Sequence, residues 1–259
     1  DEAVWLIMSA LHLPMETLNN FLDARLTQSE RDKLAQLIEQ RITKHTPTAY
    51  LLKEAWLQGF KFYVDERVLI PRSFIAELLA SDLSPWVEFP EMIESAADIC
   101  TGSGCLGVLL ANSFPNAAID VVDISQDAID VCNINIANYG LENQITAIKS
   151  DMFSALAGKK YDIIISNPPY VDAPSMAALP AEYQNEPQLA LGSGTAGLDH
   201  THTLLREAAS YLNDDGLLIV EIGHNREALE AAYPNTIFNW LETSSGNEFV
   251  FLLTKEQLI

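Results

Sequence analysis

From residue 73 onwards, short apolar runs alternate with stretches in which apolar residues recur every three or four positions. A short apolar run is typical of a buried strand, and the three-to-four spacing is typical of an amphipathic helix. Strands are predicted at residues 96–100, 118–122, 145–148, 161–165 and 217–222, and helices at residues 105–113, 125–138, 200–212 and 225–233. This alternation predicts the α/β class, a doubly wound parallel sheet with helices on both faces.

The last part of the chain breaks this alternation. Residues 236–241 and 247–253 form two further apolar runs, joined by Ser244-Ser245-Gly246 with no helix between them. Two strands joined by a short turn form a hairpin. One of these two strands must therefore run antiparallel to the rest of the sheet.

Residues 1–46 are predicted to be helical. Thr27 and Glu30 form a capping box, in which the hydroxyl and the carboxylate satisfy free backbone amides at the start of a helix. Apolar residues then follow at helical spacing: Leu34, Leu37, Ile38 and Ile42. Pro47 is expected to end this helix, because proline disfavours helical geometry in the residue before it.

A short hairpin is predicted next, with strands at residues 60–64 and 68–70 around the turn Asp65-Glu66-Arg67. The chain then divides into three parts. These are a small helical domain (1–57), a β-hairpin linker (58–72) and an α/β domain (73–259).

Composition adds limits on the class of protein. The chain has 259 residues, of which 48% are hydrophobic, enough for a full α/β core and a small second domain. No run of about 18 apolar residues predicts a membrane span, and the start lacks the basic leader and apolar stretch of a signal peptide. Cys100, Cys105 and Cys132 form no metal-like or disulfide framework, which fits a reducing cytoplasm. We therefore expect a cytoplasmic protein with no membrane partner.

The charge is distributed very unevenly. The net charge is −21; residues 1–72 hold 10 acidic and 9 basic side chains, whereas residues 73–259 hold 26 acidic and 6 basic side chains. So acidic a surface repels phosphate backbones, and no direct binding of nucleic acid is expected. The acidity favours a basic partner by electrostatic steering, or it serves solubility only.

A glycine loop follows the first strand of the α/β domain. Gly102, Gly104 and Gly107 match the spacing G-x-G-x-x-G within residues 98–107, which end a strand and open a helix. That spacing lets the backbone pass close to a nucleotide, although Gly107 could serve helix packing only. Cys100 in the same loop is interpreted as a small packing residue rather than a reactive thiol.

Two carboxylates follow the next two strands. Asp123 can accept hydrogen bonds from both hydroxyls of a ribose. Asp151 can accept from an adenine amino group, with Met152 packing near the ring. Both aspartates could instead be ordinary strand-end caps. The glycine spacing also occurs in nicotinamide-dependent dehydrogenases, but the terminal hairpin and the motif after the fourth strand count against that class.

The sequence Asn167-Pro168-Pro169-Tyr170 follows the fourth strand directly, at the edge where open α/β sheets bind ligands. The prolines end regular structure, and the turn can aim the Pro168 carbonyl outward beside the side-chain carbonyl of Asn167. Two such acceptors can take both N–H groups of an amide or aromatic amine and leave its lone pair facing a methyl donor. Tyr170 is expected to pack against the flat substrate group. The purely structural alternative is a rigid proline turn with an exposed tyrosine.

These motifs resemble those of the class I S-adenosylmethionine-dependent methyltransferases and, among them, the protein-(glutamine-N5) methyltransferases. The resemblance covers nearly the whole chain. It rests on the helical N-terminal part and on residues 47–51, 68–72, 98–107, Asp123, Asp151, 167–170, Glu186-Pro187 and 220–223. It implies a seven-stranded Rossmann-like sheet with an antiparallel last strand, S-adenosyl-L-methionine as cofactor, and methyl transfer to the N5 amide nitrogen of a glutamine in a protein.

The resemblance also implies the residues of the site. Asp123 would hold the cofactor ribose, and Asn167 would grip the glutamine amide while bordering the cofactor. The glycine loop would line the cofactor through Cys100, Thr101, Gly102, Ser103 and Gly104, and its adenine would meet Asp151 and Met152. The catalytic motif is completed by Pro168, Pro169 and Tyr170.

The branch of the family sets the expected substrate. The release-factor branch usually continues after Pro-Arg as Pro-Glu-Thr-Glu, whereas this chain has Ser73-Phe74-Ile75-Ala76-Glu77 after Arg72. Residues 63–72 and 253–258 are instead similar to the branch that methylates the third protein of the large ribosomal subunit. That basic protein is the expected partner, a class I release factor is the alternative, and residues 1–57 are expected to recognise the substrate.

Two other functions fit the sequence less well than this one. Adenine-N6 methyltransferases of nucleic acids share the tetrapeptide, but residues 73–259 are strongly acidic and no basic target-recognition domain is present. A non-catalytic S-adenosylmethionine-binding module would not need each catalytic position that this chain retains.

Most of the other polar residues are expected to be structural. His200 and His202 are two residues apart, so on a helix their side chains point to different faces and cannot easily share a metal ion. No metal site is therefore expected, and both histidines are predicted to lie at the solvated start of a helix. Arg72 lies at the active-site mouth or pairs with a carboxylate. Glu186 and Glu221 are expected to orient local loops.

Overall fold

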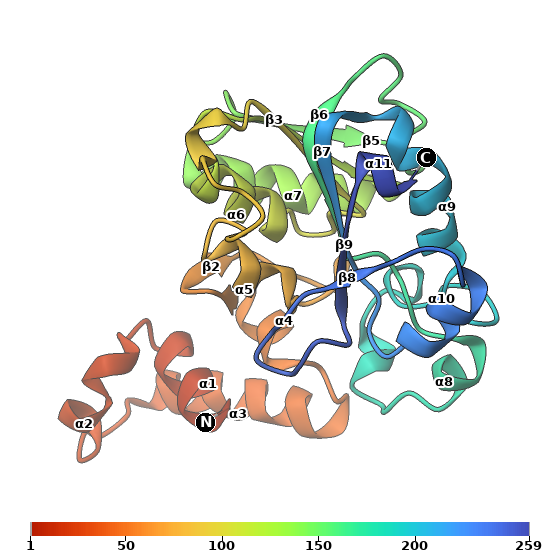
Figure 1. Cartoon of the computed structure of the whole chain (residues 1–259). Coiled ribbons are helices and arrows are strands. Elements are labelled where there is room, and N and C mark those ends of the chain that lie inside the picture. Colours follow the sequence, from red (N-terminus) through yellow and green to blue (C-terminus); the bar gives the residue numbers. More distant parts are fainter. Residues whose placement is uncertain (1, 259) are drawn as a thin grey trace.

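The structure is a computed structural model that describes residues 2–258. Its body is a seven-stranded sheet with the order β5-β4-β3-β6-β7-β9-β8 (Figure 1). The strands are β3 (Ser95–Ile99), β4 (Ala118–Asp123), β5 (Ile145–Lys149), β6 (Tyr161–Ser166), β7 (Leu212–Glu221), β8 (Asn239–Trp240) and β9 (Val250–Thr254). Strands β3 to β7 run parallel, and β9 runs antiparallel to its neighbours β7 and β8. The predicted fold class, including the antiparallel last strand, is confirmed.

Helices cover both faces of this sheet. One side holds α5 (Ile75–Leu79), α6 (Cys105–Ser113) and α7 (Gln126–Tyr139); the other holds α9 (Asp199–Glu207), α10 (Arg226–Ala232) and α11 (Lys255–Leu258). In β6, Ile163 and Ile165 belong to the core under the first group, and Ile164 belongs to the core under the second. Burial on both faces explains why the strands appear in the sequence as continuous apolar runs.

The order of the strands determines where a ligand can bind. The chain moves outward from β3 to β4 and β5, then returns to the other side of β3 with β6. In open α/β sheets a crevice opens at the carboxyl ends of the strands where the order reverses. The glycine loop, Asp123, Asp151 and Asn167 all follow strands at this edge.

Residues 2–52 form a helical arm beside the body (Figure 1). It contains α1 (Glu2–Ala10), the 3₁₀ helix η1 (Met15–Thr17), α2 (Leu18–Phe21), α3 (Gln28–Thr43) and α4 (Thr48–Leu52). The capping box at the start of α3 is confirmed, since Thr27 and Glu30 bond each other's backbone amides. Pro47 does not end α3, which stops at Thr43; it precedes α4 instead.

The predicted hairpin is wrong in its turn and in its second strand, whereas its first predicted strand (60–64) contains the observed strand at Phe60–Phe62. The observed strands are β1 (Ala55–Leu57) and β2 (Phe60–Phe62), joined by Gln58 and Gly59, both with positive φ. Residues 68–70 form no strand, because Asp65 accepts hydrogen bonds from the backbone and side chain of Arg67 and bends the chain. Val68 is apolar because it is buried in the core, with 1% of its surface exposed.

A long excursion follows β6 and returns to the pocket edge. It contains α8 (Ala173–Ala177), η3 (Tyr183–Asn185) and η4 (Gln188–Ala190); the other 3₁₀ helices are η2 (Pro90–Met92) and η5 (Ala208–Ser210). Glu182 pairs with Arg41 of α3 at 3.1 Å, and the Asn185 amide donates to the His45 carbonyl at 3.0 Å. The excursion thus ties the helical arm to the body. Within residues 2–258, no helix is both long and apolar enough to cross a membrane.

Candidate active site

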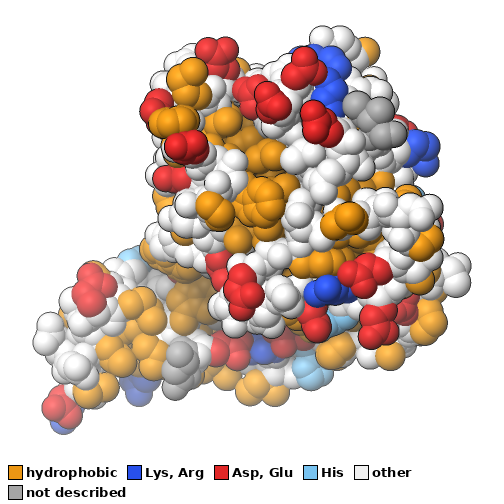
Figure 2. Space-filling view, in the orientation of Figure 1, with side chains coloured by type: hydrophobic (Ala, Val, Ile, Leu, Met, Phe, Trp, Pro, Cys, Tyr) orange, Lys and Arg blue, Asp and Glu red, His pale blue; other side chains and the backbone are white. Residues whose placement is uncertain are grey.

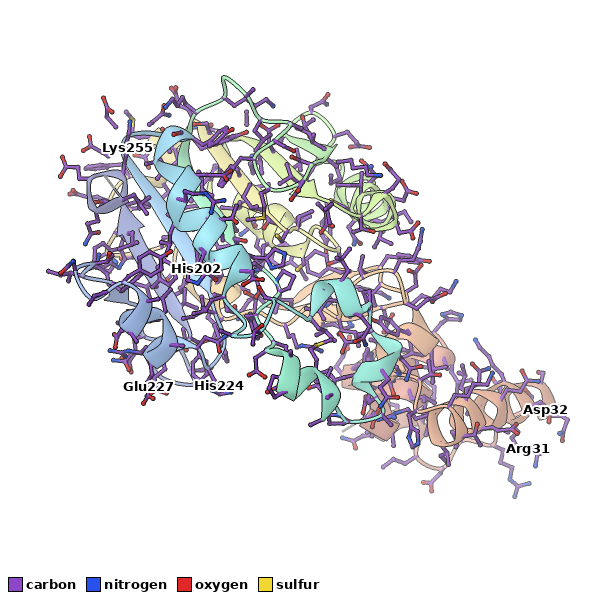
Figure 3. All side chains as sticks on the ribbon, turned by 90° about the vertical axis from the view of Figure 1, so that its right-hand side faces the viewer. Arg31, Asp32, His202, His224, Glu227 and Lys255 are labelled. Carbon is purple, nitrogen blue, oxygen red and sulfur yellow. The ribbon has the colours of Figure 1, made fainter. Side chains whose placement is uncertain are left out.

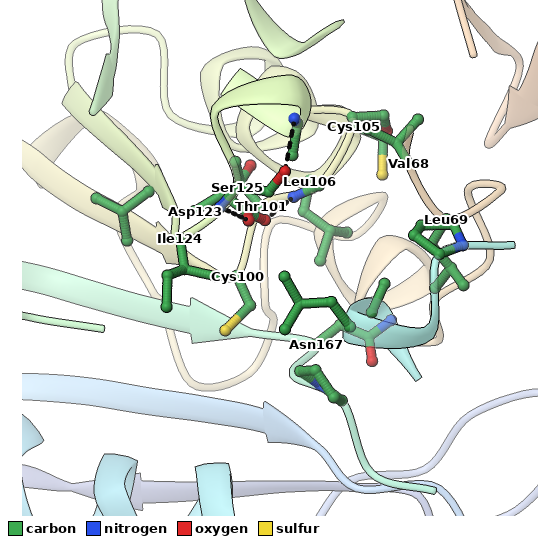
Figure 4. Close-up of a pocket in the computed structure, with 18 of the residues that line it drawn as sticks. Val68, Leu69, Cys100, Thr101, Cys105, Leu106, Asp123, Ile124, Ser125 and Asn167 are labelled. Carbon is green, nitrogen blue, oxygen red and sulfur yellow. Dashed lines mark hydrogen bonds between the residues drawn. The ribbon is translucent and has the colours of Figure 1, made fainter. Parts of the chain in front are cut away.

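A single pocket at the carboxyl edge brings together most of the predicted site residues (Figure 4). The predicted residues that line it are Cys100, Thr101, Gly102, Ser103, Asp123, Asp151, Met152, Asn167 and Pro169. Three predicted residues do not line it: Gly104, Pro168 and Tyr170. The described part of the chain has no cluster of three or more side chains suited to a metal ion.

The three glycines of the loop serve different purposes. Gly102 has φ +55°, and a Cβ added there would meet no atom within 4 Å, so its backbone is open to a ligand. A Cβ on Gly104 would lie 2.5 Å from the Cys132 sulfur, and one on Gly107 would lie 2.5 Å from a methyl group of Val121. Gly104 and Gly107 therefore allow the first turn of α6 to pack closely, as proposed for Gly107 from the sequence.

Asp123 lines the pocket and is held there by backbone amides on both of its oxygens. Its Oδ2 accepts from the Gly102 amide and its Oδ1 accepts from the Ser125 amide, each at 2.9 Å (Figure 4). A carboxylate oxygen has two lone pairs, so each oxygen can accept one more hydrogen bond. Burial raises the pKa of Asp123. The geometry suits a diol such as the two hydroxyls of a ribose.

Beneath the loop lies Asp98, which is completely buried. The Thr101 hydroxyl donates to its Oδ2, while its Oδ1 has no hydrogen-bond partner in residues 2–258. Burial raises the pKa of Asp98 to about 7. The contact fixes Thr101 at the floor of the pocket.

Two residues on the pocket wall adopt left-handed backbone conformations that are uncommon outside glycine. Cys100 has φ +63° and Met152 has φ +48°, and their sulfur atoms lie 3.8 Å apart. Such strain persists only where the surroundings determine it, and it concentrates at functional sites. Burial raises the pKa of the Cys100 thiol, so the thiol stays protonated and its interpretation as a packing residue is supported.

The Asn-Pro-Pro-Tyr turn presents Asn167 to the pocket, opposite Asp123 in Figure 4. The Asn167 amide nitrogen lies 3.4 Å from the Arg72 carbonyl, to which it donates. That contact leaves the side-chain carbonyl as the acceptor available to a ligand. Tyr170 lies behind the turn: its carbonyl accepts from Asn225 at 2.8 Å, and its ring packs so closely on Gly223 that a Cβ there would be 2.7 Å away.

Two buried glutamates hold the segment that meets Asn167. The carboxylate of Glu186 accepts hydrogen bonds from both terminal nitrogens of Arg72, at N···O distances of 2.8 and 3.0 Å. The Glu186 side chain is only 2% exposed. Glu221 accepts from the Ser73 hydroxyl at 2.6 Å and from the Phe74 amide at 2.9 Å. Arg72 thus both lines the pocket and pairs with a carboxylate, the two alternatives left open by the sequence.

Replacing Glu186 by glutamine is expected to lower kcat/KM about tenfold while leaving cofactor affinity unchanged. The change removes a charged bidentate partner of Arg72, and a small shift of a positioned group is costly in rate. Steady-state kinetics with calorimetric binding would measure both effects. Glu207→Gln, which breaks the surface pair with Arg206, is the matched control and should change neither. An unchanged kcat/KM in Glu186→Gln would contradict this role.

The free energy of unfolding is expected to depend on pH through Glu221. Burial raises the pKa of Glu221 from 4.5 to about 7. Between these values the unfolded chain has released the proton and the folded chain still holds it, so the free energy of unfolding falls as pH rises. A shift of this size corresponds to about 3 kcal/mol. Glu221→Gln should therefore gain stability over the parent between about pH 5 and pH 8. A difference in urea unfolding that stays flat with pH would refute the prediction.

His200 lies at the start of a helix as predicted, but the expectation that it is solvated there is wrong. The residue is partly buried in the first turn of α9 and lines the same pocket as Asp151 and Met152. His202 lies outside the pocket lining and contacts the Tyr233 hydroxyl at 2.9 Å.

Comparisons with known proteins agree with this geometry. A family model described as the methyltransferase small domain matches residues 76–180. Fold and site therefore define a methyltransferase with a Rossmann-like catalytic sheet. The chain is 56% identical over 259 residues to the ribosomal protein uL3 glutamine methyltransferase of Neisseria gonorrhoeae, covering 100% of this chain and 86% of that protein. It is 50% identical to that of Bordetella pertussis, covering 100% and 87%. The chain belongs to the family of ribosomal protein uL3 glutamine methyltransferases.

Solved structures support the fold alone. A methyltransferase from Pyrococcus furiosus has a TM-score of 0.53 at 15% identity, covering 88% of this chain and 99% of that chain. The hMettl16 catalytic domain in complex with a 3′UTR hairpin has a TM-score of 0.56 at 13% identity, covering 88% and 80%.

Proposed function

We propose that this enzyme transfers a methyl group from S-adenosyl-L-methionine to the N5 amide nitrogen of a glutamine in ribosomal protein uL3. The observation that carries the proposal is the placement of Asn167 in one pocket with the glycine loop and Asp123. Asn167 provides a hydrogen-bond acceptor for an amide, and the glycine loop and Asp123 suit a nucleoside. Membership of the family supports the choice of substrate.

The cofactor would lie along the carboxyl edge of β3, β4 and β5. The open backbone at Gly102 and the neighbouring Cys100, Thr101 and Ser103 would accommodate its methionine end. Asp123 would accept both ribose hydroxyls, and Asp151 and Met152 would border the adenine. When bound, the sulfonium supplies an activated methyl group; the protein supplies binding, orientation and exclusion of water.

The glutamine amide would be oriented by two acceptors, the side-chain carbonyl of Asn167, which lines the pocket, and the carbonyl of Pro168, which belongs to the same turn but does not line the pocket. Accepting both N–H groups points the nitrogen lone pair at the methyl donor and stabilises the positive charge that develops during transfer. Alignment of the reactants can contribute about 7–11 kcal/mol. No strong base is required, because the methylated nitrogen is acidic and loses its proton after transfer. Pro169 and Tyr170 would keep the turn rigid.

Recognition of the protein substrate is assigned to the remaining parts. We assign it to the helical domain (1–57), whose last three residues form strand β1 of the hairpin, with residues 58–72 as linker and residues 73–259 as the catalytic domain. Acidic side chains are scattered over the visible face of the body rather than gathered in one patch (Figure 2). A diffuse negative field of this kind attracts a basic protein without fixing its orientation.

The proposal is tested by offering two purified acceptors, uL3 and a class I release factor, with labelled S-adenosylmethionine. Label on uL3 is the expected result. Label on the release factor instead would keep the chemistry and overturn the substrate. Binding of cofactor without label on either protein would overturn the substrate assignment altogether.

A further inference from the structure

The side chain of His200 is held by a buried serine. Its Nδ1 lies 2.7 Å from the Ser193 hydroxyl, and its own backbone N–H donates to the same oxygen at 3.2 Å. Ser193 is 1% exposed, and its amide donates to the Val171 carbonyl at 2.9 Å, just after the Asn-Pro-Pro-Tyr turn. The imidazole is thus fixed to the same framework as Asn167.

These contacts select one tautomer. The Ser193 oxygen already accepts the backbone N–H of His200, and its own hydrogen has no other acceptor within residues 2–258. Ser193 therefore donates to Nδ1, and the proton of the neutral ring sits on Nε2. Burial lowers the pKa of His200 and favours this neutral form. Nε2 has no partner in the described chain, so its N–H is free for a ligand.

The free donor lies on a wall that also carries an acceptor. His200 and Asp151 line the same pocket, and Asp151 acts electrostatically on His200. The amino-bearing edge of adenine presents the complementary pair, an exocyclic N–H donor beside a ring nitrogen that accepts. A wall with one acceptor and one donor matches that edge.

We propose that His200 is a cofactor-binding residue, whose Nε2–H donates to a ring nitrogen of adenine beside the amino group accepted by Asp151. The inference rests on S-adenosylmethionine being the cofactor. This hydrogen bond would make the site selective for adenine over bases that carry an acceptor where adenine has its amino group and a donor where adenine has the ring nitrogen.

The test is the Kd of S-adenosylhomocysteine, measured by calorimetry on four proteins. His200→Leu should weaken binding about fivefold to tenfold, as expected for one hydrogen bond. His200→Gln retains an N–H donor of similar reach and should recover most of the affinity. His202→Leu is the matched control: it lies on the same helix, is labelled in Figure 3 on the catalytic body, and does not line the pocket, so its Kd should equal that of the parent.

A second readout separates a hydrogen bond from a packing effect. The parent should bind the 1-deaza or the 7-deaza analogue of S-adenosylhomocysteine more weakly than the natural compound, and His200→Leu should lose that preference. Equal affinities of the parent and His200→Leu for S-adenosylhomocysteine would overturn the inference. So would a preference against the deaza analogue that persists in His200→Leu. Failure of the parent to bind S-adenosylhomocysteine would instead overturn the proposed cofactor.

Discussion

Replacing Asn167 by alanine is expected to lower kcat of methyl transfer by about 10²–10³-fold, the usual effect of removing one preorganised group that stabilises charge in the transition state. The cofactor Kd should stay within about twofold, because the contact proposed for this side chain is with the acceptor amide and not with the ribose or the adenine. Single-turnover transfer from labelled cofactor, with calorimetry on the same protein, measures both quantities.

Asn116→Ala is the matched control for this variant. Asn116 donates to the Glu91 carbonyl at 3.0 Å, as Asn167 donates to that of Arg72, but it precedes β4 and so lies at the opposite edge of the sheet. It should transfer methyl groups at the parent rate. If Asn167→Ala kept near-parent kcat, the assigned role of this turn would be untenable.

Replacing Asp123 by alanine is expected to abolish useful cofactor binding. Hydrogen bonds to a charged group contribute about 1.5–3 kcal/mol each, so losing two should raise Kd by about 10²-fold or more. The variant also loses two acceptors of backbone amides, those of Gly102 and Ser125. Calorimetric titration with S-adenosylhomocysteine measures the effect.

Asp127→Ala controls for the loss of a negative charge near the site, since Asp127 is exposed in the first turn of α7 four residues later. Its affinity should match the parent. Comparable weakening in both variants would show that Asp123 acts through general charge, and unchanged binding in Asp123→Ala would remove it from the cofactor site.

Strands and helices of the body could be predicted because their physical causes are local. The helix predicted at residues 105–113 coincides with α6, and each strand from β3 to β6 lies within one residue of its apolar run. The first hairpin could not be placed in this way. An apolar run such as residues 68–70 looks alike whether it pairs as a strand or packs singly into a core. The true turn also requires positive φ at Gln58, which its side chain does not signal.

The same distinction between local and long-range causes separates the site residues that could be predicted from those that could not. Asp123 and Asn167 could be predicted because each follows a strand, and parallel strands bring their carboxyl ends to one edge. Glu186 lies 114 residues from its partner Arg72, and no spacing rule links them. His200 enters the pocket only because the excursion after β6 returns Ser193 beside Val171. The isolated Asp-His-Thr-His stretch offered no signal for that return.

The most direct test of glutamine methylation by this enzyme is to locate the methyl group in the product. Purified uL3 would be incubated with the enzyme and S-adenosylmethionine, digested, and analysed by tandem mass spectrometry. We expect one methyl group on the side-chain amide nitrogen of a glutamine, absent when Asn167→Ala replaces the parent. A methyl group on a lysine, a carboxylate or the backbone of uL3 would contradict this expectation, because an arrangement of two carbonyl acceptors would then have no amide to orient.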